Sequence, residues 1–532
     1  MRCGAKFIVV TGGVLSGLGK GLFISSLGRL LKSRGYKIIP IKIDPYVNVD
    51  AGTMNPIEHG EVFVLDDGSE VDMDLGNYER FLDIKLNTES NITTGKIFKK
   101  VIDKERRGDY LGKTVQLIPH VTGELKEWYR KLAEKTGADI VMIEIGGTVG
   151  DIENQIFLES VRELSLEEDV LFIHCTLVPT MKVVGEQKTK PTQQSVRMLR
   201  EIGIFPNMIY CRSEKPLVDR TREKLSRFCG VDKDHIISGY DVKHIYEIPL
   251  VLEKQNVAAN VIRELNLPAG KKDMKEWKKF VENLKNPKKK LKIAITGKYT
   301  YLHDSYVSIL EALKHASGNL SCNVELKWIE TTDIEKGKLK VEDALKDVDG
   351  ILVPGGFGRR GTEGKIECIR YAREKNIPFL GLCYGFQLAV VEYARNVCGL
   401  KDANSTEINR ETPYPVIDIL PEQKKINEKG ATMRLGAYPA LLKRGSVVRK
   451  LYGKEKITER HRHRYEVNPE YIEILEKNGL EFSGVSPNRK LMEFLEIPNH
   501  KFFVATQAHP EFTSRPLKPN PMFLGFVKSC MD

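Results

Sequence analysis

The sequence predicts an α/β protein with two domains, each built on a largely parallel sheet. At 532 residues, the chain is too long for one hydrophobic core. In both halves, short apolar runs alternate with helical patterns, which is typical of parallel strands joined by crossover helices. A Pro/Gly break and a basic amphipathic pattern separate the halves. We therefore expect one domain over 1–268, a helical linker over 269–290 and a second domain over 291–532.

Composition narrows the class of protein. The formal net charge of +11 fits anionic ligands, but no basic motif interleaved with aromatic residues indicates a nucleic-acid partner. The nine cysteines include no Cys-x-x-Cys pair, which favours a reducing compartment without structural zinc. The sequence shows neither a signal peptide nor an apolar run of membrane length. We expect a soluble cytoplasmic protein with no membrane partner.

A candidate nucleophile lies at Cys383, between Gly381 and Gly385. An apolar run precedes it and a helical pattern follows, as in a nucleophile elbow, where a sharp turn raises the side chain above the sheet. The helix N-terminus would favour a thiolate there. An isolated cysteine in such a segment would more often be a core residue, so the interpretation depends on partners elsewhere.

Those partners follow an apolar run near the C-terminus. His509 would accept the thiol proton, and Glu511 would orient the imidazole. A buried strand also runs into a glycine-rich turn over 350–358, whose amides, with the N–H of Tyr384, would form an oxyanion hole. Together these features resemble the class I glutamine amidotransferase domain, which releases ammonia from glutamine.

The first domain opens with a candidate phosphate loop over 11–21. Its glycines would turn backbone amides toward phosphates, Lys20 would neutralise them, and the next helix would point its positive end at them. The pattern resembles a P-loop imperfectly. Gly13 and Gly19 are separated by five residues instead of four, and Gly21 replaces the Ser or Thr that usually contacts magnesium. A purely structural glycine turn remains the alternative.

Acidic residues elsewhere are candidate ligands for Mg²⁺. Glu70, Asp72 and Asp74 alternate with apolar residues, which predicts that they share one face of a strand, a pattern that also suits a solvated edge. Glu144 is the single charge of an apolar strand, near its carboxyl end, where parallel sheets bind ligands. Lys42, at the end of another strand beside Asp44, is a candidate clamp on a transferred phosphoryl group.

The order of several segments in the first half resembles that of the CTP synthase family: residues 12–21, 42–48, 52–64, 72–80, 105–112, 144–153 and 188–193. With the second half, this resemblance covers nearly the whole chain. It implies an ATP-dependent ligase of pyrimidine biosynthesis. Such an enzyme phosphorylates the 4-oxygen of UTP, and ammonia from glutamine then displaces phosphate to give CTP.

The resemblance also implies site residues, with Asp74 and Glu144 as the metal ligands. The implied ATP site comprises Gly17, Leu18, Gly19, Lys20, Gly21, Leu22, Lys42, Asp74, Tyr240, Asp241 and Val242. The implied UTP and CTP sites comprise Ser16, Asp151, Ile152, Glu153, Lys188, Thr189, Lys190, Pro191, Thr192, Gln193 and Lys224. The implied glutamine and oxyanion site comprises Gly355, Gly356, Tyr384, Gly385, Phe386, Gln387, Glu407 and Arg464.

Regulation and assembly follow from the same resemblance. GTP would activate glutamine hydrolysis allosterically through the loop 357–365, acting as a lid. CTP would inhibit by sharing the triphosphate subsite of UTP, with its base and ribose held near Asp151, Ile152 and Glu153. A dry passage for ammonia would narrow at Pro56, His59 and Val62. We expect a homotetramer, with filaments as a further form.

Three other interpretations compete. A different amidoligase, such as one acting on a corrinoid carboxylate, shares the domain pair but typically lacks the Lys-Thr-Lys-Pro-Thr-Gln loop at 188–193. A partition-type ATPase would explain the first domain but leave Cys383 and His509 without a role. A non-catalytic filament protein would not need the intact catalytic positions.

Overall fold

The computed structural model describes residues 4–52, 54, 60–181, 185–297, 303–419 and 433–532. They form two compact units. The first comprises Met1–Thr53 and Val71–Val281, and the second comprises Met54–Glu70 and Glu282–Asp532. The second unit therefore contains a short segment from the N-terminal half of the sequence.

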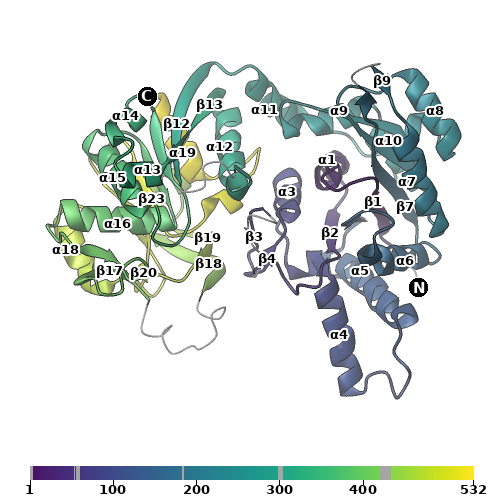
Figure 1. Ribbon diagram of the computed structural model, residues 1–532, viewed down its shortest axis with the longest axis horizontal. Helices are drawn as coiled ribbons and strands as arrows, with labels where there is room; N and C mark the ends of the chain where they lie inside the picture. The colour runs from purple at the N-terminus through teal and green to yellow at the C-terminus, as the bar shows by residue number, and fades with distance from the viewer. Residues whose placement is uncertain (1–3, 53, 55–59, 182–184, 298–302, 420–432) are drawn as a thin grey trace. The chain divides into compact units, whose positions relative to one another are not determined.

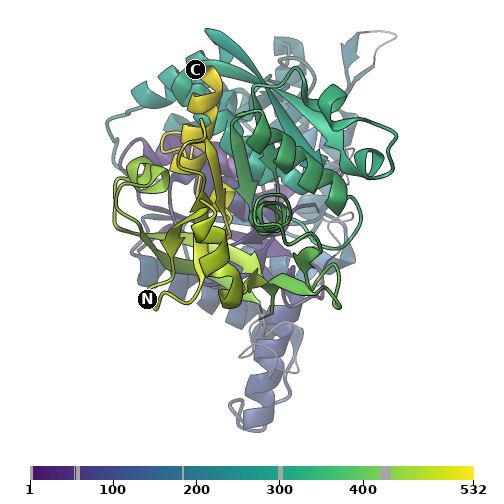
Figure 2. The ribbon, with the colours of Figure 1, turned by 90° about the vertical axis from the view of Figure 1, so that its left-hand side faces the viewer.

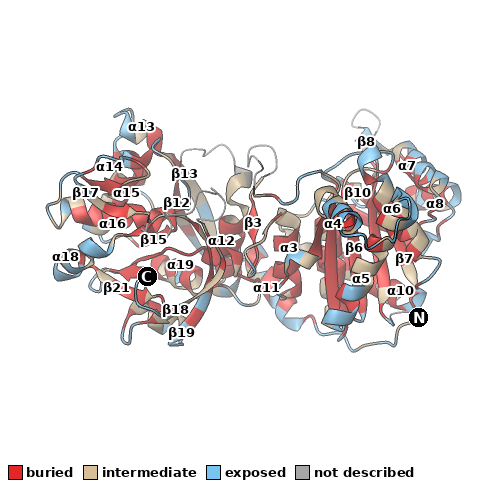
Figure 3. Ribbon diagram, turned by 90° about the horizontal axis from the view of Figure 1, so that it is seen from below, coloured by how far each residue is buried: buried red, intermediate tan, exposed pale blue. Residues whose placement is uncertain are grey.

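A seven-stranded parallel sheet forms the centre of the first unit (Figure 1). Most of its residues are buried on both faces, as expected for parallel strands covered by helices, and Figure 3 shows these strands largely in red. In spatial order the strands are β11 (Ile236–Tyr240), β10 (Met208–Ser213), β7 (Val170–Leu177), β1 (Lys6–Gly12), β6 (Ile140–Ile145), β2 (Ile38–Asp44) and β5 (Asn91–Thr93).

Helices follow most of these strands. α1 (Lys20–Lys32) begins directly after the candidate phosphate loop and buries Phe23, Leu27 and Leu30, as their helical spacing predicts. The further helices are α3 (Met73–Leu82), α4 (Thr94–Arg107), α5 (Thr122–Thr136), α6 (Gln155–Leu164), α7 (Lys190–Glu201), α8 (Asp219–Cys229), α9 (Ile248–Lys254), α10 (Val257–Glu264) and α11 (Lys275–Lys285). α11 lies within the stretch where the sequence predicts a helical linker.

A nine-stranded mixed sheet forms the centre of the second unit. In spatial order its strands are β13 (Cys322–Glu330), β12 (Lys289–Gly297), β14 (Gly350–Val353), β15 (Phe379–Leu382), β23 (Phe503–Thr506), β22 (Met492–Glu496), β21 (Glu481–Val485), β18 (Arg434–Leu442) and β19 (Lys456–His463). The strands from β13 to β23 run parallel, and the remaining pairs are antiparallel. Both units are therefore α/β, which confirms the predicted fold class.

Two apolar clusters fill the second unit. One includes buried residues of α15 (Thr362–Glu374) and α16 (Tyr384–Asn396), and the other those of α12 (Val307–Leu320) and α19 (Pro521–Met531). Figure 2 looks toward this unit, with α19 in yellow. The shorter elements are α13 (Thr331–Glu335), α14 (Val341–Leu345), α17 (Val447–Tyr452), α18 (Ile472–Lys477) and a small sheet of β16 (Ala403–Ser405), β17 (Tyr414–Asp418) and β20 (Glu466–Val467).

The predicted strand through Glu70, Asp72 and Asp74 is wrong. β4 (Glu70–Val71) ends before Asp72, which is instead the N-cap of α3. The Asp72 carboxylate accepts a hydrogen bond from the Asp74 backbone N–H at 2.8 Å. This bond satisfies a helix N–H that has no intrahelical partner, so the acidic pattern marks a helix start.

Membrane-length helices are absent from the part of the chain described above. No helix there combines the length and the apolar character that a bilayer span requires.

Two candidate active sites

Cys383 stands on the predicted elbow, between β15 and α16. Its backbone has φ 47° and ψ −95°, a conformation that non-glycine residues rarely adopt. Its N–H donates to the Thr506 carbonyl at 2.8 Å, which joins the turn to β23. A side chain at Gly381 would come within 2.9 Å of the Ala505 Cβ, and one at Gly385 would overlap the Val353 carbonyl. Both glycines are therefore required by close packing, and the elbow is confirmed.

His509 and Glu511 form the expected pair. The imidazole Nδ1 lies 2.7 Å from the Glu511 Oε1. Burial lowers the pKa of His509, but the Glu511 carboxylate and the Cys383 sulfur outweigh it and raise this pKa to about 10. The imidazole is therefore protonated at neutral pH, a state that favours thiolate at a nearby cysteine. Its buried Nε2 meets no hydrogen-bond partner among the described residues, which leaves it available for proton exchange.

The glycine-rich turn after β14 lies against this pair. A side chain at Gly355 would come within 2.8 Å of the His509 Cε1. The Gly358 N–H donates to Glu407 at 3.0 Å, and the Tyr384 hydroxyl donates to the Gly358 carbonyl at 2.8 Å. These bonds hold the turn beside the first residue of α16, so the structure brings together the two predicted sources of oxyanion-hole amides.

Gln387 and Gln507 add amide groups near the thiol. The Gln387 Nε2 donates to the Tyr465 carbonyl at 3.1 Å, whereas its buried Oε1 has no partner among the described residues. An unpaired buried acceptor suits a substrate that carries N–H donors. The Gln507 Nε2 lies 3.7 Å from the Cys383 Sγ. Gln507 was not among the residues predicted from the sequence, although its position directly after β23 and two residues before His509 could have indicated it.

In the first unit, the loop between β1 and α1 has the features of a phosphate cradle. Gly17 and Gly19 adopt φ 75° and 81°, and Lys20 is the first residue of α1. The Lys20 Nζ donates to the Gly147 carbonyl at 3.0 Å. A side chain at Gly12 would come within 2.5 Å of this ammonium group. The loop therefore places a lysine and a helix N-terminus together, as anion binding requires.

Lys42 stands among three carboxylates. It is in register with Glu144 on the neighbouring strand, and its Nζ lies 3.0 Å from the Glu144 Oε1. It also pairs with Asp74 and lies 3.8 Å from the Asp44 Oδ1. Burial lowers the pKa of Lys42, but these carboxylates outweigh it and raise that pKa well above its usual value. The ammonium group is therefore charged, and it sits at the carboxyl ends of β2 and β6.

The same carboxylates fit a magnesium ion. Burial raises the pKa of Asp44 to about 7 and also raises that of Glu144; Lys42 opposes both shifts, and neighbouring carboxylates add to them. A divalent cation would neutralise part of this negative charge. Within the described residues, no group of three or more potential ligands is arranged to hold a metal. Mg²⁺ commonly needs only one or two carboxylates together with phosphate oxygens and water.

The comparisons with known proteins cover both units. Residues 6–267 match the family model for the CTP synthase N-terminus, and residues 301–529 match that for glutamine amidotransferase class-I. A CTP synthase of Thermococcus gammatolerans is 57% identical over 531 residues, which cover 99% of each chain. One of Methanocaldococcus jannaschii is 56% identical over 533 residues, covering 99% of this chain and 98% of the relative. The chain belongs to the CTP synthase family. It is an enzyme of the ligase class.

One solved structure is similar to part of the chain. The glutaminase domain of Trypanosoma brucei CTPS with bound acivicin is 38% identical, covering 45% of this chain and 94% of that chain, with a TM-score of 0.43.

Six of the residues that the CTP synthase resemblance assigns to the UTP and CTP sites, 188–193, lie at the start of α7. Thr189 is the N-cap, and Pro191 occupies the first turn. The Thr192 hydroxyl donates to the Leu177 carbonyl at 3.0 Å, and the Gln193 amide donates to the Thr189 hydroxyl at 3.0 Å. Lys188, just before the helix, pairs with Glu186 at 2.5 Å. The Thr192 bond thus connects this helix start to the end of β7.

Other implied positions lie on loops after strands of the same sheet. Ser16 is exposed in the loop before α1, and the exposed residues from Asp151 to Glu153 follow β6. Tyr240 ends β11, and Asp241 pairs with Arg212 at 2.5 Å. These positions share the edge formed by the carboxyl ends of the parallel strands, where such sheets bind ligands. Lys224 is exposed on α8.

The predicted ammonia constriction falls mainly outside the described residues. Pro56 and His59 are among the residues that the structure does not describe. Val62 is buried and belongs to the second unit.

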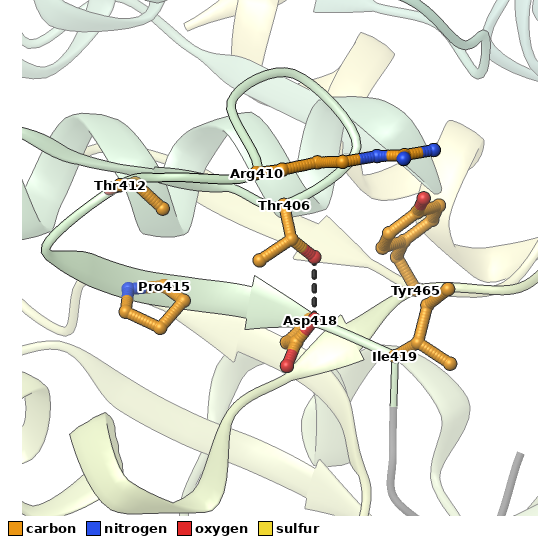
Figure 4. A pocket seen from close by; sticks show the side chains of 7 residues that line it. All are labelled: Thr406, Arg410, Thr412, Pro415, Asp418, Ile419 and Tyr465. Carbon is orange, nitrogen blue, oxygen red and sulfur yellow. Dashed lines mark hydrogen bonds between the residues drawn. The ribbon is translucent and has the colours of Figure 1, made fainter. Parts of the chain in front are cut away.

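A separate hollow of about 430 Å³ opens in the second unit (Figure 4). The Thr406 hydroxyl donates to the Asp418 carboxylate at 2.5 Å on one wall, and the Arg410 side chain extends above the Tyr465 ring. Thr406 precedes Glu407, and Tyr465 follows Arg464, two residues implied in glutamine binding. The full lining is Thr406, Arg410, Thr412, Pro415, Asp418, Ile419 and Tyr465.

Proposed function

We propose that this chain converts UTP to CTP with ATP and glutamine. The γ-phosphoryl group of ATP passes to the uracil 4-oxygen, leaving ADP. Ammonia then attacks C4, the C4–O bond breaks, and phosphate leaves with that oxygen. Glutamine and water supply the ammonia and leave glutamate. The observation that carries this proposal is the presence of a cysteine-histidine-glutamate site and a lysine-carboxylate site on one chain of this family.

In the first unit, the residues present suit phosphoryl transfer. The P-loop-like turn and Lys20 would bind the ATP phosphates, and the start of α7 would bind the UTP triphosphate. Lys42 would contact the transferred phosphoryl group, whose charge its ammonium stabilises. Asp74 and Glu144 would hold Mg²⁺, which supplies further neutralisation of phosphate charge when bound.

In the second unit, Cys383 would attack the glutamine side-chain carbonyl. The protonated His509 would donate its proton to the departing nitrogen, so ammonia leaves as a glutamyl thioester forms. Water, deprotonated by the now neutral His509, would then hydrolyse the thioester and regenerate the thiolate. Gln387, Glu407 and Arg464 would bind the substrate beside the oxyanion amides.

The regulation and assembly of this enzyme are part of the proposal. GTP would activate glutamine hydrolysis through the loop 357–365, which the Gly358–Glu407 bond links to the glutamine-binding residues. CTP would inhibit through the exposed loop from Asp151 to Glu153 and the shared triphosphate subsite. We expect a cytoplasmic homotetramer that also forms filaments.

The reaction is tested by chromatographic detection of CTP from UTP, ATP and Mg²⁺. Glutamine and ammonium chloride are supplied in separate reactions, each with and without GTP. We expect CTP from both nitrogen sources, and GTP stimulation with glutamine only. If no reaction mixture yields CTP, the proposed function is wrong.

A further inference from the structure

The segment 63–70 comes from the N-terminal half of the sequence but is built into the unit that carries Cys383. It lies within residues 6–267, which match the CTP synthase N-terminus, whereas the structure assigns it to the second unit. β3 (Phe63–Val64) and the turn after it lie against β18 and β19. The match to the amidotransferase family covers only residues 301–529. Residues 63–70 lie outside that match but contribute to the glutaminase unit.

An ion pair anchors this segment. The Arg460 Nε donates to the Asp66 Oδ1 at 2.6 Å, and its Nη1 donates to the Val64 carbonyl at 3.0 Å. The Arg460 side chain is 1% exposed, and the Asp66 side chain is 26% exposed. An arginine this deeply buried depends on its carboxylate, because removing one member of a buried pair leaves an uncompensated charge.

The backbone reinforces this contact. The Ala437 N–H donates to the Asp66 carbonyl at 2.9 Å. Gly436 has φ 91°, and a side chain there would come within 2.5 Å of the Gly68 nitrogen. The close approach of the two backbones thus requires glycine at 436 and fixes the position of Asp66.

Two routes lead from this segment to the catalytic histidine. The first is through the backbone, because the His509 N–H donates to the Arg460 carbonyl at 2.7 Å. The second is through rings. The Arg460 guanidinium lies 5.4 Å from the centre of Phe63, whose ring meets Phe512 edge-on at 5.1 Å, and Phe512 stacks on His509 at 5.3 Å.

We infer that Asp66 is a positioning residue for His509. By holding the Arg460 guanidinium, it fixes the main chain that hydrogen-bonds to the histidine and the ring on which the imidazole stacks. In this chain of contacts Asp66 reaches His509 through Arg460 and Phe63. The inference rests on the proposed glutaminase function, and it extends that site to a part of the sequence that matches the synthetase family model.

The test is Asp66→Asn in the full-length chain, which removes the charge with little change in shape. Asp67→Asn is the matched control, because Asp67 is the exposed neighbour of Asp66 and its carboxylate accepts the local turn N–H of Ser69 at 3.0 Å. The measurements are kcat and KM for glutamine hydrolysis, CTP formation from ammonia, and the rate at which iodoacetamide alkylates Cys383, quantified by peptide mass spectrometry.

We expect Asp66→Asn to lower the glutaminase kcat about tenfold or more, since small misplacements of a catalytic group have effects of this size. KM should stay within about twofold, and alkylation of Cys383 should slow in parallel, because a displaced imidazolium no longer favours the thiolate. CTP formation from ammonia should be unchanged. Asp67→Asn should match the wild type in every measurement.

Several results would overturn the inference. They are wild-type kcat and alkylation in Asp66→Asn, an equal loss in Asp67→Asn, or a rise in KM alone. If Asp66→Asn does not fold, Asp66→Glu is measured instead. It keeps the carboxylate but changes its position, so it should give a kcat between those of the wild type and an inactive variant. A wild-type kcat in Asp66→Glu would contradict the inference that the position of this carboxylate matters. If the wild-type chain does not hydrolyse glutamine, the proposed function fails, and the alkylation rates still decide the role of Asp66.

Discussion

The Asp74 carboxylate occupies the space where a side chain at Gly21 would stand. A Cβ atom at this glycine would overlap the carboxylate. Gly21 is the second residue of α1, at the position where a standard P-loop has the Ser or Thr that contacts magnesium. The departure from the P-loop pattern therefore has a steric reason: a carboxylate from α3 takes the place of the missing hydroxyl group.

This relationship predicts that Gly21→Ala displaces Asp74 and with it the Lys42 ion pair. We expect CTP formation to fall at least about tenfold with glutamine and with ammonia alike, because both depend on phosphoryl transfer. Glutamine hydrolysis should persist. Gly123→Ala in α5 is the control, since a Cβ at Gly123 meets nothing within 4 Å. An unchanged rate in Gly21→Ala would show that Asp74 tolerates the displacement.

Lys42 should be required for the same step. Lys42→Met keeps the length of the side chain but removes the charge that stabilises the transferred phosphoryl group, so we expect loss of CTP formation from either nitrogen source. Lys99→Met removes an equal charge from an exposed lysine, whose side chain is 65% exposed, and should have no effect. Steady-state rates with saturating ATP separate the two variants. Normal activity of Lys42→Met would contradict the assigned role.

Cys383→Ala should separate the two activities. The variant lacks the nucleophile and should form no CTP from glutamine, while ammonia-dependent formation stays at the wild-type rate. The half-buried Cys398 offers a control, and Cys398→Ala should retain both activities. Equal loss of both activities in Cys383→Ala would refute the division of labour between the units.

The His509–Glu511 pair predicts a dependence of stability on pH. In the folded state the pKa of His509 is raised to about 10, against about 6.5 for an unfolded histidine. Protonated His509 therefore contributes its full stabilisation below pH ~6.5, and that contribution is lost as pH rises toward about 10. Glu511→Gln removes one cause of the raised pKa. Its unfolding free energy should fall less steeply than that of the wild type across this range, as measured by urea titration.

The same substitution should change glutamine hydrolysis. With a lower His509 pKa, the alkaline limb of the pH–rate profile moves to lower pH. Glu470→Gln, on an exposed turn, serves as the control. A profile identical to that of the wild type would show that Glu511 does not set the protonation of His509.

Local patterns in the sequence predicted much of the structure around the candidate site residues. The elbow at Cys383 and the central strand containing Glu144 both stood out because an apolar run ended at a glycine-rich turn or at a single charge. Such patterns can be recognised because they involve residues close together in the sequence and the spacing of apolar residues within one helix or strand. The same reasoning failed at Asp72, because a short acidic alternation fits both a strand face and a helix N-cap. Only the hydrogen bond to the Asp74 N–H distinguishes them.

The sequence by itself determined the α/β class, the elbow, the histidine-glutamate pair and the glycine-rich loop before α1, since each depends on residues that are close together in the chain. Tertiary structure decided how those parts meet. It placed Asp74 against Gly21, and it joined Asp66 to Arg460, which are 394 positions apart in the chain. Neither contact leaves a periodic pattern in the sequence. Each contact forms because packing brings together segments that are distant in the sequence. Charge and the available space then determine which residues are compatible with each position.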